Sequence, residues 1–180
     1  GISHSIAVNV YETATEITGV LSGEKLHWTK ENSPYKVTGD ILIEENDQLV
    51  IDPGVKVYFV GNNYIKMNGS IYAVGTKEDP ITITKAASYN GSWNGLRIGG
   101  GSLNTTDTYT YNSGNILKYV NFSYAQTPVE LNSPVFVDHC NFTDCYDSVS
   151  VSRGSVLINN NFENGISIYS SGNIITNNRI

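Results

Sequence analysis

The side chains best suited to binding chemistry in this sequence are aromatic rings close to one another in the chain. Tyr109 and Tyr111 alternate with threonines in a polar stretch, and Tyr89 is followed closely by Trp93. Flat rings with a polar edge stack well against sugar rings. The alternative is that Trp93 belongs to a core and the tyrosines are ordinary loop residues. These four aromatics are therefore our candidate carbohydrate contacts.

Acidic side chains and histidine give weaker indications. A glycosidase needs two carboxylates about 5–10 Å apart; Asp138, Asp144 and Asp147 are close in sequence, but such spacing arises in many loops. Residues 44–47 (EEND) have the oxygen ligands that Ca²⁺ takes, yet a solvated acidic turn explains them as well. His139 follows Asp138 directly, and because neighbours along a strand point to opposite faces we expect no catalytic pair there. We accordingly expect no metal site and no cofactor, with Ca²⁺ at 44–47 as the one alternative.

Four similar segments recur between residues 116 and 180. They read ILKYVNF, FVDHCNF, VLINNNF and IITNNRI, and begin at positions 116, 136, 156 and 174. The first, second and seventh positions are apolar in all four, and the sixth is polar. Each unit is too short to bury its own apolar face, so the units must stack on one another. A repeat near 20 residues, with short strands and asparagine at the corners, predicts an all-β solenoid.

The repeat brings opposite charges onto adjacent rungs. Arg97 is expected beside Glu130 in one outward column, and Lys118 beside Asp138 in another. We expect all four side chains to be exposed, and each pair to contribute well under ~1 kcal/mol to stability. Since Arg97 and Glu130 share an outward face, they join the candidate carbohydrate contacts.

Composition limits the classes of partner. Only 16% of the 180 residues are charged and the net charge is −6, which gives no electrostatic footprint for nucleic acid or an anionic membrane. No apolar run is long enough to span a bilayer, so we expect no membrane insertion. Cys140 and Cys145 fit the columns as small buried residues, and a local disulfide is the alternative left open.

The chain divides into a cap and a solenoid. Residues 1–34 lack the repeat and are interpreted as an N-terminal capping segment, because an exposed solenoid end is an adhesive sheet edge. Residues 35–180 are predicted to form about six coils. The insertion at 99–115 (GGGSLNTTDTYTYNSGN) is too polar and glycine-rich to enter a core, so we expect it to project from the coils.

A family resemblance extends this interpretation. The chain carries SPYKVTGDILIEENDQLVIDPGVKVYF, then NGSIYAVGTKEDPITIT and WNGLRI, and later VLINNNFENGISI. These motifs resemble the right-handed parallel β-helix modules, with a pectate-lyase-like repeat, of secreted and cell-surface archaeal and bacterial proteins. The resemblance spans roughly residues 28–180 and implies a right-handed parallel β-helix. It does not select a function, because this scaffold carries lyases, hydrolases, adhesins and structural modules.

We therefore expect a non-catalytic β-helix module of an extracellular or cell-surface protein, which binds polysaccharide or cell-wall glycan in adhesion, display or spacing. The alternative is a polysaccharide lyase or glycoside hydrolase, or the scaffold part of one, so enzymatic activity stays open. Lyases of this fold use a basic residue beside clustered carboxylates, and no column here stacks two acids on adjacent rungs. The last repeat has no charged or proline-rich segment after it, so we expect the C-terminal end to pack on the rest of a larger protein or on another chain.

Overall fold

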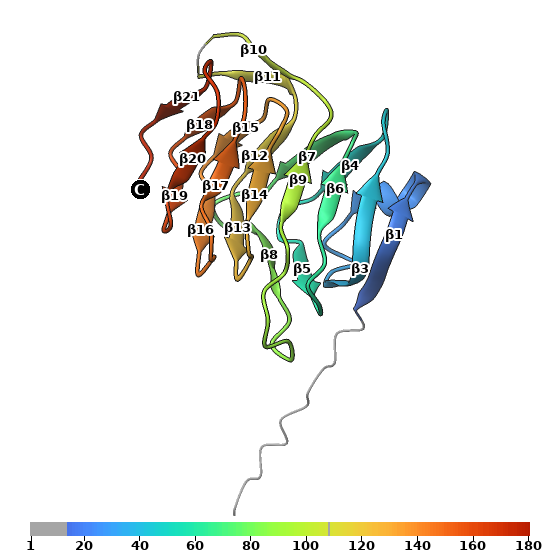
Figure 1. The fold of residues 1–180 in the computed structure, drawn as a ribbon. Helices are drawn as coiled ribbons and strands as arrows, with labels where there is room; N and C mark the ends of the chain where they lie inside the picture. Colours follow the sequence, from blue (N-terminus) through green and yellow to red (C-terminus); the bar gives the residue numbers. More distant parts are fainter. Residues whose placement is uncertain (1–13, 108) are drawn as a thin grey trace, which may run out of the picture.

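The computed structural model describes residues 14–107 and 109–180, which form a stack of parallel strands wound into a solenoid (Figure 1). One face is a seven-stranded parallel sheet, so the solenoid has about seven turns, close to the expected count of about six. Its strands, in spatial order, are β2 (His27–Trp28), β4 (Gln48–Ile51), β7 (Ser70–Val74), β12 (Ile116–Lys118), β15 (Phe136–Asp138), β18 (Val156–Ile158) and β21 (Ile174–Thr176).

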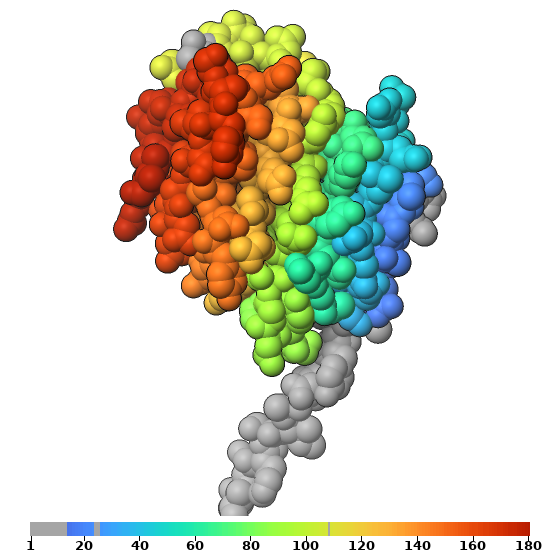
Figure 2. Space-filling view, in the orientation of Figure 1, coloured from blue at the N-terminus to red at the C-terminus, as the bar shows by residue number. Residues whose placement is uncertain are grey.

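The other two faces share one continuous sheet that is joined at the long strand β3 (Tyr35–Ile43). On one side of β3 lie β5 (Lys56–Phe59), β8 (Ile81–Lys85), β13 (Val120–Ser123), β16 (Asn141–Thr143) and β19 (Asn161–Phe162). On the other side lie β6 (Ile65–Met67), β9 (Leu96–Ile98), β14 (Val129–Leu131), β17 (Val149–Val151) and β20 (Ile166–Ile168). Figure 2 shows the successive coils as bands that run from blue to red.

The N-terminal part of the described chain adds to the first coils. Strand β1 (Thr15–Leu21) runs parallel to β3, and the short 3₁₀ helix η1 (Gly23–Leu26) leads into β2. Ile17 and Leu21 are buried in the core cluster. Residues 1–13 of the expected cap lie outside the described residues, so the capping role stays a prediction.

The core is a set of aligned columns, as the repeat predicts. Phe122, Phe142 and Phe162 lie on successive rungs with ring centroids 5.0 and 4.9 Å apart and planes within 1° and 8° of parallel. Val137 and Leu157, at the second apolar position of the repeat, are buried in the neighbouring sheet. This confirms that the second position faces the core. Each coil thus covers the apolar face of the next, because a three-residue strand cannot bury its own side chains.

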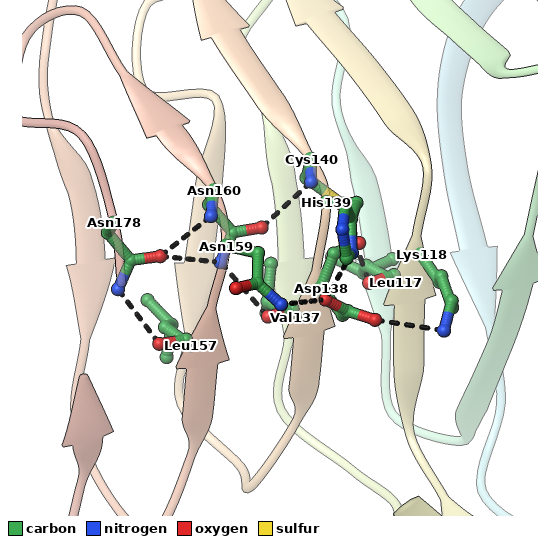
Figure 3. Close-up of polar contacts among 10 residues, drawn as sticks. All are labelled: Leu117, Lys118, Val137, Asp138, His139, Cys140, Leu157, Asn159, Asn160 and Asn178. Carbon is green, nitrogen blue, oxygen red and sulfur yellow. Dashed lines mark hydrogen bonds and ion pairs between the residues drawn. The ribbon is translucent and has the colours of Figure 1, made fainter. Parts of the chain in front are cut away.

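One sharp corner sets the direction of the side chains around it. Between the seven-stranded sheet and the β13 side of the other sheet, the chain turns on single residues with positive φ: Tyr119, His139, Asn159 and Asn177, with φ of 49°, 54°, 58° and 54°. Asparagine tolerates this left-handed conformation better than most residues. Inside the corner, Asn160 Oδ1 accepts from the backbone N–H of Cys140, and Asn178 Oδ1 accepts from that of Asn160, both at 2.8 Å (Figure 3).

The insertion at 99–115 was expected to project from the coils, but it packs against them. The segment forms an antiparallel hairpin of β10 (Leu103–Thr105) and β11 (Tyr111–Gly114), which lies against the outer face of the seven-stranded sheet. Leu103 and Tyr111 pack on an outer cluster of buried residues that includes Ile116 and Phe136. Leu103 and Tyr111 thus anchor an insertion whose overall composition is polar.

Candidate functional site

Two rows of amide and hydroxyl side chains cover the outer face of β8, β13, β16 and β19. Parallel pairing places Asn121, Asn141 and Asn161 in one row, and Ser123 beside Thr143 in the next. We call this the amide–hydroxyl face, and it comprises Thr82, Thr84, Asn121, Ser123, Asn141, Thr143 and Asn161.

Contacts along each row connect neighbouring rungs. Asn141 Nδ2 donates to Asn121 Oδ1 at 2.7 Å, and Ser123 Oγ donates to Thr84 Oγ1 at 2.8 Å. All of these side chains are exposed or half-buried, whereas the residues between them on each strand point into the core. The rows repeat with the strand spacing of about 4.8 Å.

An open groove of about 490 Å³ runs along one border of this face. Its lining combines amides, a cation and aromatic rings: Lys77, Pro80, Tyr119, Asn121, His139, Asn141 and Asn159. The rings of Tyr119 and His139 stack with centroids 4.8 Å apart and planes 28° from parallel. Both rings line the groove beside the amide row; His139 is exposed, and Tyr119 is half-buried with Lys118 Nζ 5.7 Å from its ring centroid.

His139 is held by a buried carboxylate, contrary to the expectation that it and Asp138 would point apart. His139 Nδ1 lies 2.5 Å from Asp138 Oδ1, because the turn at His139 ends the alternation of the strand (Figure 3). Asp138 was also expected to be exposed, and it is only 5% exposed. Its Oδ2 accepts from Lys118 Nζ at 2.9 Å, so the predicted Lys118–Asp138 pair exists but one member is buried.

The carboxylate remains ionised despite its burial. Burial raises the pKa of Asp138, but hydrogen bonds from Lys118 and Asn159, with the positive charge of Lys118, outweigh burial and lower the pKa below its usual 3.8. Asn159 Nδ2 donates to Asp138 Oδ1 at 3.0 Å. Three side chains from three adjacent rungs therefore converge on Asp138 and fix its position.

A second aromatic border lies across the amide–hydroxyl face. Tyr124 is 42% exposed, and Lys85 Nζ lies 5.2 Å from the centroid of its ring. Together with Tyr58, Ala86 and Ala87 they line an open hollow of about 650 Å³. The face is consequently bordered on both sides by accessible rings.

The aromatic residues proposed from sequence do not come together. Trp93 is fully buried, stacks on Phe59 with centroids 4.4 Å apart, and therefore offers no ring face to a ligand. Tyr89 is half-buried and its hydroxyl donates to the carbonyl of Ser92. Tyr109 is 58% exposed on the connection between β10 and β11. Tyr111 packs edge-on against Phe136 and donates its hydroxyl to the carbonyl of Gly114.

The structure does bring Arg97 and Glu130 together, on a different face. They lie opposite each other on β9 and β14, with Arg97 Nε 3.2 Å from Glu130 Oε1. The guanidinium also lies over the ring of Tyr64, 4.6 Å from its centroid. This contact is the cross-strand charge pair that the repeat predicts.

Sequence reasoning missed the residues that border the groove. Tyr119 and His139 occupy the same position of the repeat, 20 residues apart, and neither is among the carbohydrate contacts predicted from sequence. The sequence does contain a signal for them, because Tyr119 and His139 stand at a repeat position that asparagine occupies on the next two rungs. Tyr124 has positive φ of 57° at the opposite corner and is exposed.

Three further properties of the described residues concern metal-binding groups, membrane-spanning helices and the cysteines. Within residues 14–107 and 109–180, no group of three or more His, Cys, Asp or Glu side chains is arranged to hold a metal ion. No helix in that part of the chain is long and apolar enough to cross a membrane. Cys140 and Cys145 are both buried free thiols, in agreement with their expected role as small core residues.

Comparison with known proteins gives one result. Residues 19–128 match the family model described as a pectate-lyase-like beta helix domain. No curated protein and no solved structure matches the chain. The matched stretch covers more than half of the sequence and runs from β1 through the coils to the end of β13 and its following turn. With its stacked parallel strands, the chain belongs to the pectate-lyase-like β-helix family.

Proposed function

We propose that this protein binds a glycan chain along the amide–hydroxyl face, as a non-catalytic module of a secreted or cell-surface protein. The observation that carries the proposal is the continuous set of amide and hydroxyl side chains between two borders of accessible rings. Sugars have hydroxyl groups that pair with amides and C–H faces that stack on aromatic rings. The face offers both kinds of partner together.

The repeat suits an extended polymer. Adjacent rungs present the same type of side chain about 4.8 Å apart, so a chain that lies across the rungs meets equivalent partners repeatedly. Asn121 and Asn141 are already bonded to each other. The corner beside them is fixed by the buried amide of Asn160 and the half-buried amide of Asn178. Such preorganised side chains lose little conformational entropy when a ligand binds, which favours affinity.

A second candidate function is cleavage of the bound glycan. It is favoured by the imidazole of His139, which lines the open groove and is held by a buried carboxylate. An imidazole held in this way is the arrangement that general acid–base catalysis uses. Binding and cleavage are separated by whether products are released.

The test is a panel of soluble polysaccharides, namely β-glucan, xylan, galactomannan, polygalacturonate and alginate, assayed for binding by calorimetry and for release of reducing ends. Tyr119→Asn is the informative variant, because asparagine occupies the same corner on later rungs at Asn159 and Asn177 and tolerates its positive φ. Loss of a stacking contact of about 1–1.5 kcal/mol should weaken binding about tenfold.

Tyr109→Asn is the matched control, because Tyr109 is more exposed but lies on the hairpin. We expect it to bind as the wild type does, and both variants to keep the melting temperature. Failure of every polysaccharide to bind, or an equal loss in the two variants, would contradict the proposal. Release of new reducing ends would replace it with the cleavage function.

A further inference from the structure

The imidazole of His139 is bound at one nitrogen and free at the other. Nδ1 is held by Asp138 Oδ1 at 2.5 Å (Figure 3). The imidazole ring stacks on the ring of Tyr119. Nε2 has no hydrogen-bond partner among the residues that the structure describes, and 43% of the side chain is exposed. Because the ring lines the groove and Nδ1 is taken by the buried carboxylate, Nε2 is the nitrogen left for a ligand.

The charge of Asp138 decides which nitrogen carries hydrogen. An ionised carboxylate only accepts hydrogen bonds. Lys118 and Asn159 both donate to this carboxylate, and they hold its pKa below the usual range despite the opposing effect of burial. Nδ1 must therefore be the donor in the pair. In the neutral ring, Nε2 then has no hydrogen and is an acceptor.

The corner itself does not require this pair. Two later rungs place Asn159 and Asn177 at the same position with nearly the same φ, so asparagine is sufficient for the turn. The residue before Asn159 is Ile158, an uncharged side chain that occupies the register position of Asp138 in the next rung. A buried carboxylate is costly to desolvate and is not needed for packing there. The turn and the register at this corner therefore do not require the pair of Asp138 and His139.

We propose that Asp138 positions His139 so that Nε2 accepts a hydrogen bond from a hydroxyl group of the bound glycan. The nature of the ligand rests on the proposed function, whereas the fixed ring state follows from this chain alone. Asp138 is a positioning residue in this arrangement, because it acts through His139 and does not reach the ligand. The amides of Asn121 and Asn141 line the same groove as the imidazole.

The ring state is tested without any glycan by ¹⁵N spectra of the histidine side chains in the full chain. In the neutral form of the ring, His139 should show a protonated Nδ1 and an unprotonated Nε2. In Asp138→Asn the ring should lose this single state and give averaged shifts. A wild-type ring with hydrogen on Nε2 would overturn the inference. The variant His139→Asn, which suits the corner, assigns the resonance.

The hydroxyl contact is tested with whichever polysaccharide of the panel binds best. Its addition should shift the Nε2 resonance and leave Nδ1 nearly unchanged, and His139→Asn should lower affinity about tenfold with an unchanged melting temperature. Binding that leaves Nε2 unshifted, or that is as tight in His139→Asn, would overturn this inference while the proposed function stands. If no polysaccharide binds, the proposed function and the hydroxyl contact are both refuted, and the ring state is still decided by the spectra.

Discussion

Replacing Asn160 by alanine should destabilise the protein more than any other single amide removal at this corner. Asn160 is 2% exposed, its Oδ1 accepts from the N–H of Cys140 at 2.8 Å, and its Nδ2 donates to the carbonyl of Val137 at 3.0 Å. Alanine leaves both backbone groups buried without these partners. At about 1–3 kcal/mol for each unsatisfied group, the loss is about 2–6 kcal/mol.

The assay is thermal and urea unfolding of the two proteins side by side. For a chain of this size each kcal/mol lowers the melting temperature by about 2–4 °C, so a loss of about 4 kcal/mol predicts a fall of about 8–16 °C. Asn178→Ala is the matched control, because Asn178 makes the equivalent bonds one rung later but is half-buried and open to water. An Asn160→Ala cost no larger than that of Asn178→Ala would refute the reasoning.

Three other predictions concern the core and the buried titratable groups. Phe142→Ala should cost about 3–5 kcal/mol in unfolding experiments and more than Phe162→Ala, because Phe142 stacks on rings at both sides; equal losses would contradict it. Burial raises the pKa of Cys140 to about 12 and of Cys145 to about 11, so neither thiol should react with Ellman's reagent at neutral pH until the protein unfolds. The folded-state pKa of Asp138 lies below 3.8, so its contribution to the free energy of unfolding is complete above that value and is lost as the pH falls through the folded-state pKa. The free energy of unfolding should therefore fall less steeply with acid in Asp138→Asn than in the wild type. Identical curves would contradict this.

The repeat made the stacking predictable. Residues 20 apart occupy the same place on successive rungs, so the alignment of Phe122 with Phe142, and of Lys118 with Asp138, follows from counting. The buried state of Val137 follows in the same way, since the second position of the repeat is apolar on all four rungs. These features depend only on the period of the pattern.

The candidate site depends on geometry that the period does not reveal. The alternation of side chains along a strand predicts that Asp138 and His139 point apart. His139 instead adopts a left-handed backbone conformation, and the two side chains meet. Likewise, the composition of the hairpin hides the contact of Leu103 with the outer apolar cluster, because that contact lies between distant parts of the chain. The strand pattern alone therefore does not predict how the side chains at the corners are arranged.

The claim that a glycan lies on the amide–hydroxyl face is tested most directly by mapping backbone amide shifts of the ¹⁵N-labelled protein with the best-binding polysaccharide of the panel. The shifts should concentrate in β13, β16 and the corner residues Tyr119 and His139. The hairpin of β10 and β11 should be nearly unaffected. Shifts confined to that hairpin, or to the face of β9 and β14 that carries Arg97 and Glu130, would contradict it.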